Sequence, residues 1–241
     1  MVTAADKQSS RRDRRRTETI AEIKERAWKQ LATAGPEGLS LRGIARDMEV
    51  SPGALFHYFG GHSDLITTLC VDAYNDQADA LHAAVATGEP AGQQWRSLCH
   101  AQRRWALAHP AAFTLIAGTP IPGFSMKPEA TEAAGRRVLI AVRAAYLSAV
   151  ESGDADPSAT DVPPLAAGPL LQDLTGNAVP DTAITGIVLN AWISILGFVL
   201  GEVFGSLGPL IADTSALFDA HVTTVMRGMG FHHPQALGAG D

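Results

Sequence analysis

The feature of the sequence that most constrains the fold is an uncharged stretch of 18 residues, AITGIVLNAWISILGFVL, at positions 183–200. A helix that is apolar nearly all round must be buried in protein or lie in a membrane. Asp181 and Glu202 flank the stretch, and no Lys or Arg lies near either end to anchor it at a membrane surface. We therefore expect a helix buried in protein, with membrane association through residues 183–200 as the alternative.

One edge of this helix carries small residues. They recur at intervals of four, three, four and four positions: Asn190, Ser194, Gly197, Gly201 and Gly205. Such a stripe lets a second helix approach closely. In a chain of this size, one way to bury the helix is against the same helix of a second copy. The stripe therefore predicts a homodimer interface.

The rest of the chain also reads as helix, because its apolar residues recur at helical spacing and no alternating strand pattern stands out. Ile20, Ile23, Ala27 and Leu31 give one face of a first helix, which Gly35-Pro36 ends. Further helices are expected over about residues 40–48, 51–60, 63–85, 93–108, 111–117, 138–150, 181–206 and 213–228. Residues 152–180 are rich in Asp, Gly and Pro and indicate a connection, with one helical turn near residues 170–174. The predicted class is all-α.

Charge is placed unevenly along the chain, whose formal net charge is −6. Residues 1–16 hold six basic and two acidic residues, whereas residues 65–241 hold eight basic and sixteen acidic ones. A basic front on an acidic body suits a protein whose front touches a polyanion, although a solvated, disordered Arg tail gives the same pattern. Cys70 and Cys99 show no metal or redox spacing, and no secretory signal opens the chain. A cytoplasmic protein without disulfides, metal or cofactor is expected.

Residues 40–59 predict a helix-turn-helix. Two short helices are joined by a tight turn at Glu49-Val50, and in such units the second helix enters the major groove of DNA. Ser40 and Ser51 stand at the N-cap positions of the two helices. Leu55 and Phe59 are four residues apart, so they share the face that anchors the second helix. The small residues before them would let its N-terminus come close to the duplex.

Residues 14–66 resemble the DNA-binding domain of the TetR/AcrR family of transcriptional regulators. The resemblance lies in residues 20–34, in GLSLRGIARDMEVSPGALFHYF and in HSDLI. It implies that residues 40–59 bind the operator and that the following side chains face DNA: Ser40, Arg42, Ser51, Pro52, Gly53, Ala54, His57, Tyr58 and His62. The family often has Tyr where Phe56 stands and Lys where His62 stands. We expect Arg42 and His57 to contact bases, with DNA shape supplying further discrimination, and Arg11–Arg16 to add phosphate or minor-groove contacts.

The resemblance also implies a C-terminal helical domain that binds an effector and dimerises through its last two helices. The expected interface consists of Asn190, Ser194, Gly197, Gly201, Gly205, Leu217, His221 and Val225. The expected lining of an effector cavity consists of Trp105, His109, Phe113, Met126, Tyr146, Asn190 and Trp192. The predicted organisation is a basic disordered arm at 1–16, a DNA-binding domain of three helices at 17–64, an effector-binding and dimerisation domain at 65–231 and a flexible tail at 232–241.

The predicted function is that of a dimeric repressor that binds a palindromic double-stranded operator and responds to an unknown small lipophilic effector. No G-x-S-x-G, H-E-x-x-H, G-x-x-x-x-G-K-[ST] or strand-linked G-x-G-x-x-G motif is present, so an enzyme is not expected. The alternatives are a helical interaction protein without a DNA role and the membrane-associated protein already mentioned.

Overall fold

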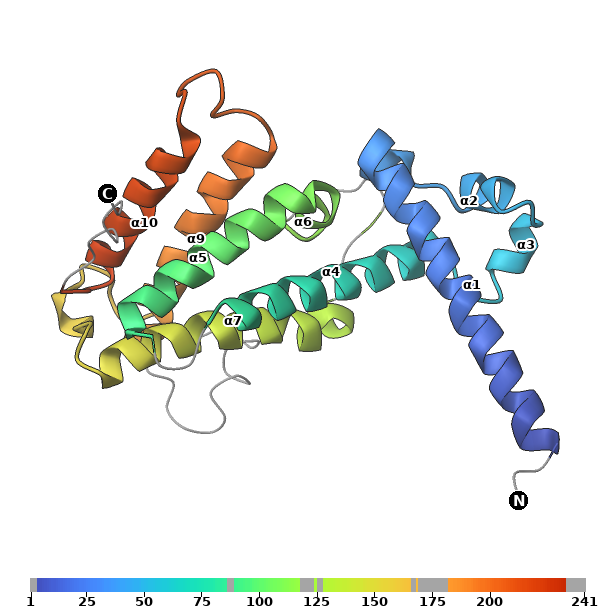
Figure 1. Ribbon diagram of the computed structural model, residues 1–241, viewed down its shortest axis with the longest axis horizontal. Helices are drawn as coiled ribbons and strands as arrows, with labels where there is room; N and C mark the ends of the chain where they lie inside the picture. Colours follow the sequence, from blue (N-terminus) through green and yellow to red (C-terminus); the bar gives the residue numbers. More distant parts are fainter. Residues whose placement is uncertain are drawn as a thin grey trace. The chain divides into compact units, whose positions relative to one another are not determined.

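The computed structural model describes residues 4–85, 89–117, 124, 128–165, 168 and 182–232. All regular elements within these ranges are helices, which confirms the predicted all-α class (Figure 1). The chain divides into two compact units, Met1–Asp72 with Ala111–Ala130 and Ala73–Pro110 with Thr131–Asp241. Met126, the helical turn expected near residues 170–174 and the tail from residue 233 lie outside the described residues.

The first unit is built from helices that are mostly short. They are α1 (Ala4–Ala34), the 3-10 helix η1 (Pro36–Gly38), α2 (Leu41–Asp47), α3 (Pro52–Leu55), the first part of α4 (His62–Ala84) and most of α6 (Pro110–Ile116). Their shared core contains Ile23, Ala27, Leu31, Leu39, Ile44, Ala45, Leu55, Phe59, Leu65, Ile66, Leu69, Cys70 and Leu115. This core extends beyond the boundary predicted at residue 64, because the first part of α4 and Leu115 near the end of α6 supply part of it.

The basic arm predicted to be disordered at residues 1–16 is helical from Ala4 onward. The prediction of disorder is wrong there for a local reason. Residues 4–16 contain no Gly or Pro and are rich in Ala, Gln, Lys and Arg, which favour helix. The extension is continuous with the rest of α1, since Thr17 Oγ1 donates to the carbonyl of Asp13 at 3.0 Å and Thr19 Oγ1 to that of Arg15 at 2.9 Å.

The turn between α2 and α3 is a Schellman motif. The Val50 N–H donates to the Ala45 carbonyl at 3.0 Å, and the Glu49 N–H donates to the Arg46 carbonyl at 3.1 Å. Glu49 occupies the left-handed position of this motif, with φ 56°. Glycine usually fills that position because a Cβ is strained there.

The second helix of the helix-turn-helix is shorter than expected. α3 holds only Pro52–Leu55, whereas the sequence predicted a helix to Gly60. Ser51 stands at its N-cap, but the Ser51 side chain makes no capping hydrogen bond. Beyond Leu55 the chain continues in tight turns, in which the Phe59 N–H donates to the Leu55 carbonyl at 3.0 Å. The burial of Leu55 and Phe59, which are 1% and 4% exposed, confirms their predicted anchoring face.

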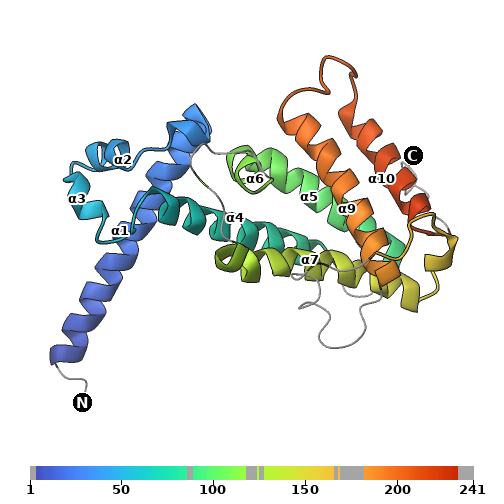
Figure 2. The same cartoon turned by 180° about the vertical axis from the view of Figure 1, so that it is seen from behind.

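The second unit contains longer helices. They are the rest of α4, α5 (Ala91–Ala108), α7 (Pro128–Glu151), the 3-10 helix η2 (Pro157–Ala159), α9 (Thr182–Val203) and α10 (Thr214–Gly228). α9 and α10 lie side by side, as Figures 1 and 2 both show. α7 joins α4, since Arg137 donates to Asn75 at 2.6 Å and to Asp79 at 2.5 Å. α7 begins ten residues before its predicted start at 138, because Pro128 and Glu129 favour a helical first turn.

α9 is the 22-residue helix that contains the uncharged stretch. It is long and apolar enough to cross a membrane, but half of its span is buried inside this unit. One side is not buried by the chain's own residues. Asn190, Ile193 and Gly197 are exposed, and 65% of Ile193 is accessible. Burial of this side against the same helix of a second copy, as the sequence predicts, therefore stays a prediction.

Glu202, near the C-terminal end of α9, forms an ion pair with Arg103 of α5. Arg103 donates to both Glu202 carboxylate oxygens, at 2.7 and 2.6 Å. The two side chains are only 14% and 8% exposed. The hydrogen bonds from Arg103 hold the pKa of the Glu202 carboxyl below its usual range, against the effect of burial.

Replacing Glu49 with Gly should stabilise the first unit. The substitution removes a left-handed Cβ, and the free energy of unfolding should rise by about 0.5–1 kcal/mol. Urea denaturation measures this change. The matched control is Arg46→Gly in the helical part of α2, which should lower stability by roughly the same amount. A loss of stability in Glu49→Gly would contradict the role given to this turn.

Replacing Glu202 with Gln should destabilise the second unit by about 2–3 kcal/mol at pH 7, because Arg103 keeps a neutral partner in place of a charged one. The folded pKa of Glu202 lies below the unfolded one. Its contribution is therefore complete above the ordinary glutamate pKa of about 4.3 and is lost as the pH falls through the folded value.

The difference between wild type and Glu202→Gln should accordingly shrink in acid, as measured by denaturation at several pH values. Glu132→Gln, on a surface pair with Arg136, should change stability by less than about 0.5 kcal/mol. A pH-independent gap between wild type and Glu202→Gln would contradict this assignment.

Candidate nucleic-acid interface

The N-terminus of α3 is the most open part of the helix-turn-helix. Ser51, Pro52 and Gly53 are exposed, while Leu55 is fully buried. A Cβ built on Gly53 meets no atom within 4 Å. Folding of this chain therefore does not require a glycine at that position. The missing side chain instead leaves room for an external surface to approach the N-terminus of the helix closely.

Ser40 positions α2 beside this helix. Its Oγ accepts a hydrogen bond from the Gly43 N–H at 3.2 Å, which confirms its predicted role as an N-cap. The Ser40 N–H donates in turn to Gln30 Oε1 at 2.9 Å, so the start of α2 is tied to α1. Arg42 follows in the first turn of α2 and is exposed. The predicted DNA contact at Arg42 thus has both solvent access and a fixed backbone.

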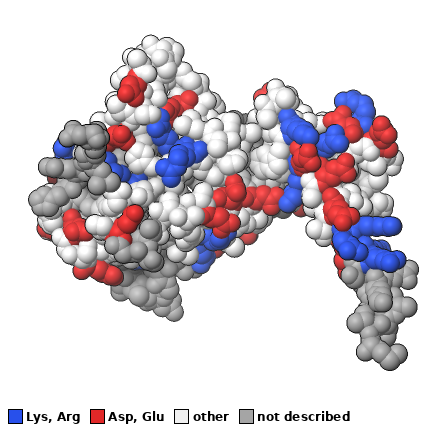
Figure 3. Space-filling model, viewed as in Figure 1, with Lys and Arg blue, Asp and Glu red and all other residues white. Residues whose placement is uncertain are grey.

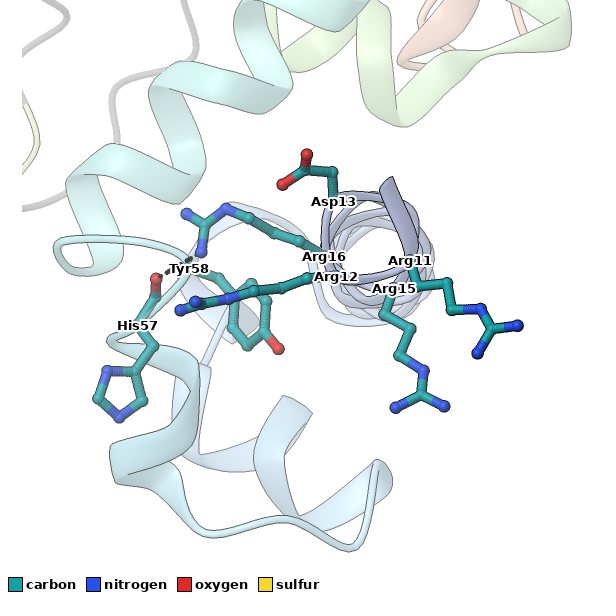
Figure 4. Close-up of a pocket in the computed structure, with 7 residues that line it drawn as sticks. All are labelled: Arg11, Arg12, Asp13, Arg15, Arg16, His57 and Tyr58. Carbon is teal, nitrogen blue, oxygen red and sulfur yellow. Dashed lines mark hydrogen bonds between the residues drawn. The ribbon is translucent and has the colours of Figure 1, made fainter. Parts of the chain in front are cut away.

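Arg16 of α1 holds the segment that follows α3. Its guanidinium donates to the His57 carbonyl at 3.2 Å and lies over the Tyr58 ring, 5.3 Å from the ring centroid (Figure 4). Tyr58 also packs against the buried core of the unit, while the His57 side chain is exposed. The basic end of α1 therefore fixes two of the predicted DNA-contacting residues. Spacing in the sequence gave no signal of this contact, because the partners are 41 and 42 positions apart.

A basic groove lies between the N-terminal part of α1 and the end of the helix-turn-helix. Its volume is about 970 Å³, and its lining comprises Arg11, Arg12, Asp13, Arg15, Arg16, His57 and Tyr58. Figure 4 shows Arg12 and Arg16 directed toward Tyr58, with Arg11 and Arg15 on the other side of the helix. Four guanidinium groups against one carboxylate give the groove a positive potential suited to phosphate.

His62 has a structural partner. Its Nε2 lies 2.9 Å from the Leu39 carbonyl, which joins the start of α4 to the segment before α2. One ring nitrogen is therefore engaged inside the unit. The predicted phosphate contact by His62 would therefore involve its other ring nitrogen, Nδ1.

The residues predicted to line an effector cavity have varied environments in the described part of the chain, and a cavity that they share stays a prediction. Trp105 donates from Nε1 to Asp76 at 2.7 Å, and the Tyr146 hydroxyl donates to the Met229 carbonyl at 2.7 Å. Trp192 is buried, whereas Asn190 and His109 are exposed. Phe113 is buried and is assigned to the first unit, and Met126 is outside the described residues. Trp105 and Tyr146 therefore tie helices together within the described part of the chain.

The predicted dimer residues fall into two groups. His221 Nε2 lies 3.2 Å from the Ser194 carbonyl, and a Cβ on Gly201 would meet Leu207 at 3.3 Å. These three residues, His221, Ser194 and Gly201, pack within one chain. Asn190, Gly197 and Gly205 are exposed, and Leu217 and Val225 are half-buried. The open part of the stripe is therefore centred on Gly197, around which a Cβ would meet nothing within 4 Å.

Comparison with known proteins agrees with this geometry. Residues 23–69 match the tetR family of bacterial regulatory proteins, and residues 95–225 match the tetracyclin repressor-like C-terminal domain. The HTH-type transcriptional regulators Rv1816 of Mycobacterium tuberculosis and Mb1846 of Mycobacterium bovis are 30% identical to the chain over 233 residues, covering 92% of this chain and 96% of each relative.

Two solved structures share the fold. The crystal structure of SCO4313 is 32% identical, with a TM-score of 0.70, and the match covers 89% of this chain and 98% of SCO4313. A protein with unknown function from Rhodococcus sp. RHA1 is 24% identical, with a TM-score of 0.65 and coverage of 88% and 95%. Fold, site and relatives together define a DNA-binding transcriptional regulator. The chain belongs to the TetR family, a membership that points to a role other than catalysis.

Replacing Gly53 with Leu separates folding from DNA binding. The new side chain meets open space, so the free energy of unfolding should stay the same or rise by up to about 1 kcal/mol. Operator affinity should fall by about tenfold or more, because the bulk holds the helix N-terminus away from DNA. Fluorescence anisotropy with labelled duplex measures the affinity. Thr33→Leu, at an exposed site near the end of α1, is the control; unchanged operator binding by Gly53→Leu would refute the close approach.

Proposed function

We propose that the chain is a dimeric, cytoplasmic repressor whose affinity for a palindromic operator changes when a small effector binds its C-terminal unit. The observation that carries the DNA-binding part is the exposed N-terminus of α3 beside the arginine-rich end of α1. The N-terminus of α3 carries little side-chain bulk, which suits insertion into the major groove. The arginine groove supplies cations that suit the adjacent phosphates.

Dimerisation is proposed through the exposed side of α9. Ile193 on α9 and Phe204 just after its end are large apolar side chains that are 65% and 58% exposed. Exposed apolar surface of this kind is typical of protein interfaces. Gly197 lies between them and lets another helix approach closely. Two copies would then present two α3 helices to half-sites about 34–36 Å apart.

Control by an effector is proposed to act through α4. This helix contributes residues His62–Asp72 to the first unit and Ala73–Ala84 to the second. An effector that favours one position of α4 would change the spacing of the two α3 helices. The coupling free energy would be about 1–3 kcal/mol, and DNA would alter effector affinity by the same factor.

Operator binding is tested with a labelled duplex from the region beside the protein's own gene, titrated at several salt concentrations. The logarithm of the binding constant should fall linearly with the logarithm of salt, because each phosphate contact releases about 0.9 counterions. Arg42→Ala should weaken binding at fixed salt by about tenfold. Lack of duplex binding even in dilute buffer would refute the proposal and favour a helical interaction protein without a DNA role.

The dimer is tested by replacing Gly197 with Leu. In the single chain the new side chain has open space, so the monomer should fold normally. It would collide with a helix packed on this stripe, and the dimer dissociation constant should rise by about tenfold or more. Analytical ultracentrifugation over a concentration series measures this change. Ala216→Leu on the exposed side of α10 gives a comparison, and an unaltered dimer in Gly197→Leu would place the interface elsewhere.

A further inference from the structure

A second pocket lies on the C-terminal unit, apart from the residues predicted to bind an effector. Its volume is about 400 Å³, and it is bordered by the end of α4 at Ala84, by α5 and by α10. α5 contributes Gln93, Arg96, Ser97, His100 and Arg104, and α10 contributes Asp219. A volume of this size suits a small organic molecule.

The α5 residues of this pocket form one continuous face. Each of them lies three or four positions from at least one other, which places them on the same side of a helix. Lys and Arg side chains gather on the molecular surface over α5 in Figure 3. The pocket wall is therefore a row of polar and cationic groups, with Ser97 and Gln93 at its neutral end.

Arg96 and Arg104 give the pocket its charge. Arg96 is only 7% exposed, and its guanidinium donates to Thr223 Oγ1 on α10 at 3.1 Å. Arg104 is exposed at the same face. A guanidinium held in a largely buried position presents a fixed set of donors to a carboxylate or phosphate.

Asp219 offsets only one of the two guanidinium charges, and its carboxylate contacts His100 Nε2 at 3.1 Å. Burial lowers the pKa of His100; Asp219 raises it, and Arg104, Arg96 and Arg103 lower it further. His100 therefore lies in the field of three arginines. Arg103 is paired with Glu202 and does not line the pocket, whereas Arg96 and Arg104 do.

We propose that this pocket binds a small organic anion, through a carboxylate or phosphate group held by Arg96 and Arg104 and a hydroxyl or carbonyl group met by Ser97 and Gln93. The role of this pocket as an effector site rests on the proposed function, whereas its binding of an anion does not. The ligand class is more polar than the lipophilic effector expected from the family resemblance. The pocket volume of about 400 Å³ is larger than an inorganic anion.

Isothermal titration calorimetry on the full chain tests this site with two probes, citrate for the carboxylate and glucose 6-phosphate for the phosphate. The arginine groove of the first unit is another anion site, so the background is the variant Arg11→Gln, Arg12→Gln, Arg15→Gln. At least one probe should bind saturably to that background. Adding Arg104→Gln should weaken that binding about tenfold or more, because a charged hydrogen-bond donor is lost.

Two further variants separate the pocket from general charge. Ser97→Leu keeps both arginines but fills part of the pocket, so it should abolish probe binding. Arg227→Gln removes an exposed charge at the end of α10 and should leave binding unchanged. The proposal is overturned if neither probe binds saturably at concentrations up to about 20 mM, which is twenty times a dissociation constant of about 1 mM. It is also overturned if a probe binds equally well with and without Arg104. Operator binding is measured separately on the wild-type chain, so its failure would refute the proposed function without deciding this site.

Discussion

The burial of Leu55 and Phe59 is the interaction on which the DNA-binding unit depends. α3 has four residues, and so short a helix is not stable by itself in water. Both side chains enter the core formed with Ile23, Ile44 and Leu65. Their burial fixes the rotation of α3 about its axis. The exposure of Ser51 and its neighbours is a direct consequence of that rotation.

The basic end of α1 extends the same unit beyond the helix-turn-helix. Arg16 bonds the backbone of His57 and covers the ring of Tyr58, so the helix both supports the reading segment and brings charge to it. A disordered arm would provide the same charge without a fixed position. A helix presents its guanidinium groups on a rigid scaffold, which lowers the entropy lost when they meet phosphates.

In the C-terminal unit, the polar groups that could line a ligand site are largely engaged in holding helices together. Trp105 bonds Asp76, and Tyr146 bonds the end of α10. Such buried polar contacts specify one arrangement of the helices. The arginine face of α5 lines a separate pocket, for which we propose an anionic ligand.

The sequence by itself determined the helical class, the helix-turn-helix at residues 40–59, the cap at Ser40 and the anchoring pair Leu55 and Phe59. These features follow from periodicity and capping within a few residues, which local sequence encodes. The helix-forming composition of residues 4–16 also encoded the α1 extension, although a run of basic residues is typical of disorder as well. Only the tertiary structure decided the contacts between distant residues. It paired Glu202 with Arg103 and placed Arg16 over the Tyr58 ring. It also brought Arg96, Arg104 and Asp219 to one pocket. These partners meet because helices distant in sequence pack together, and packing depends on the whole core rather than on any local pattern.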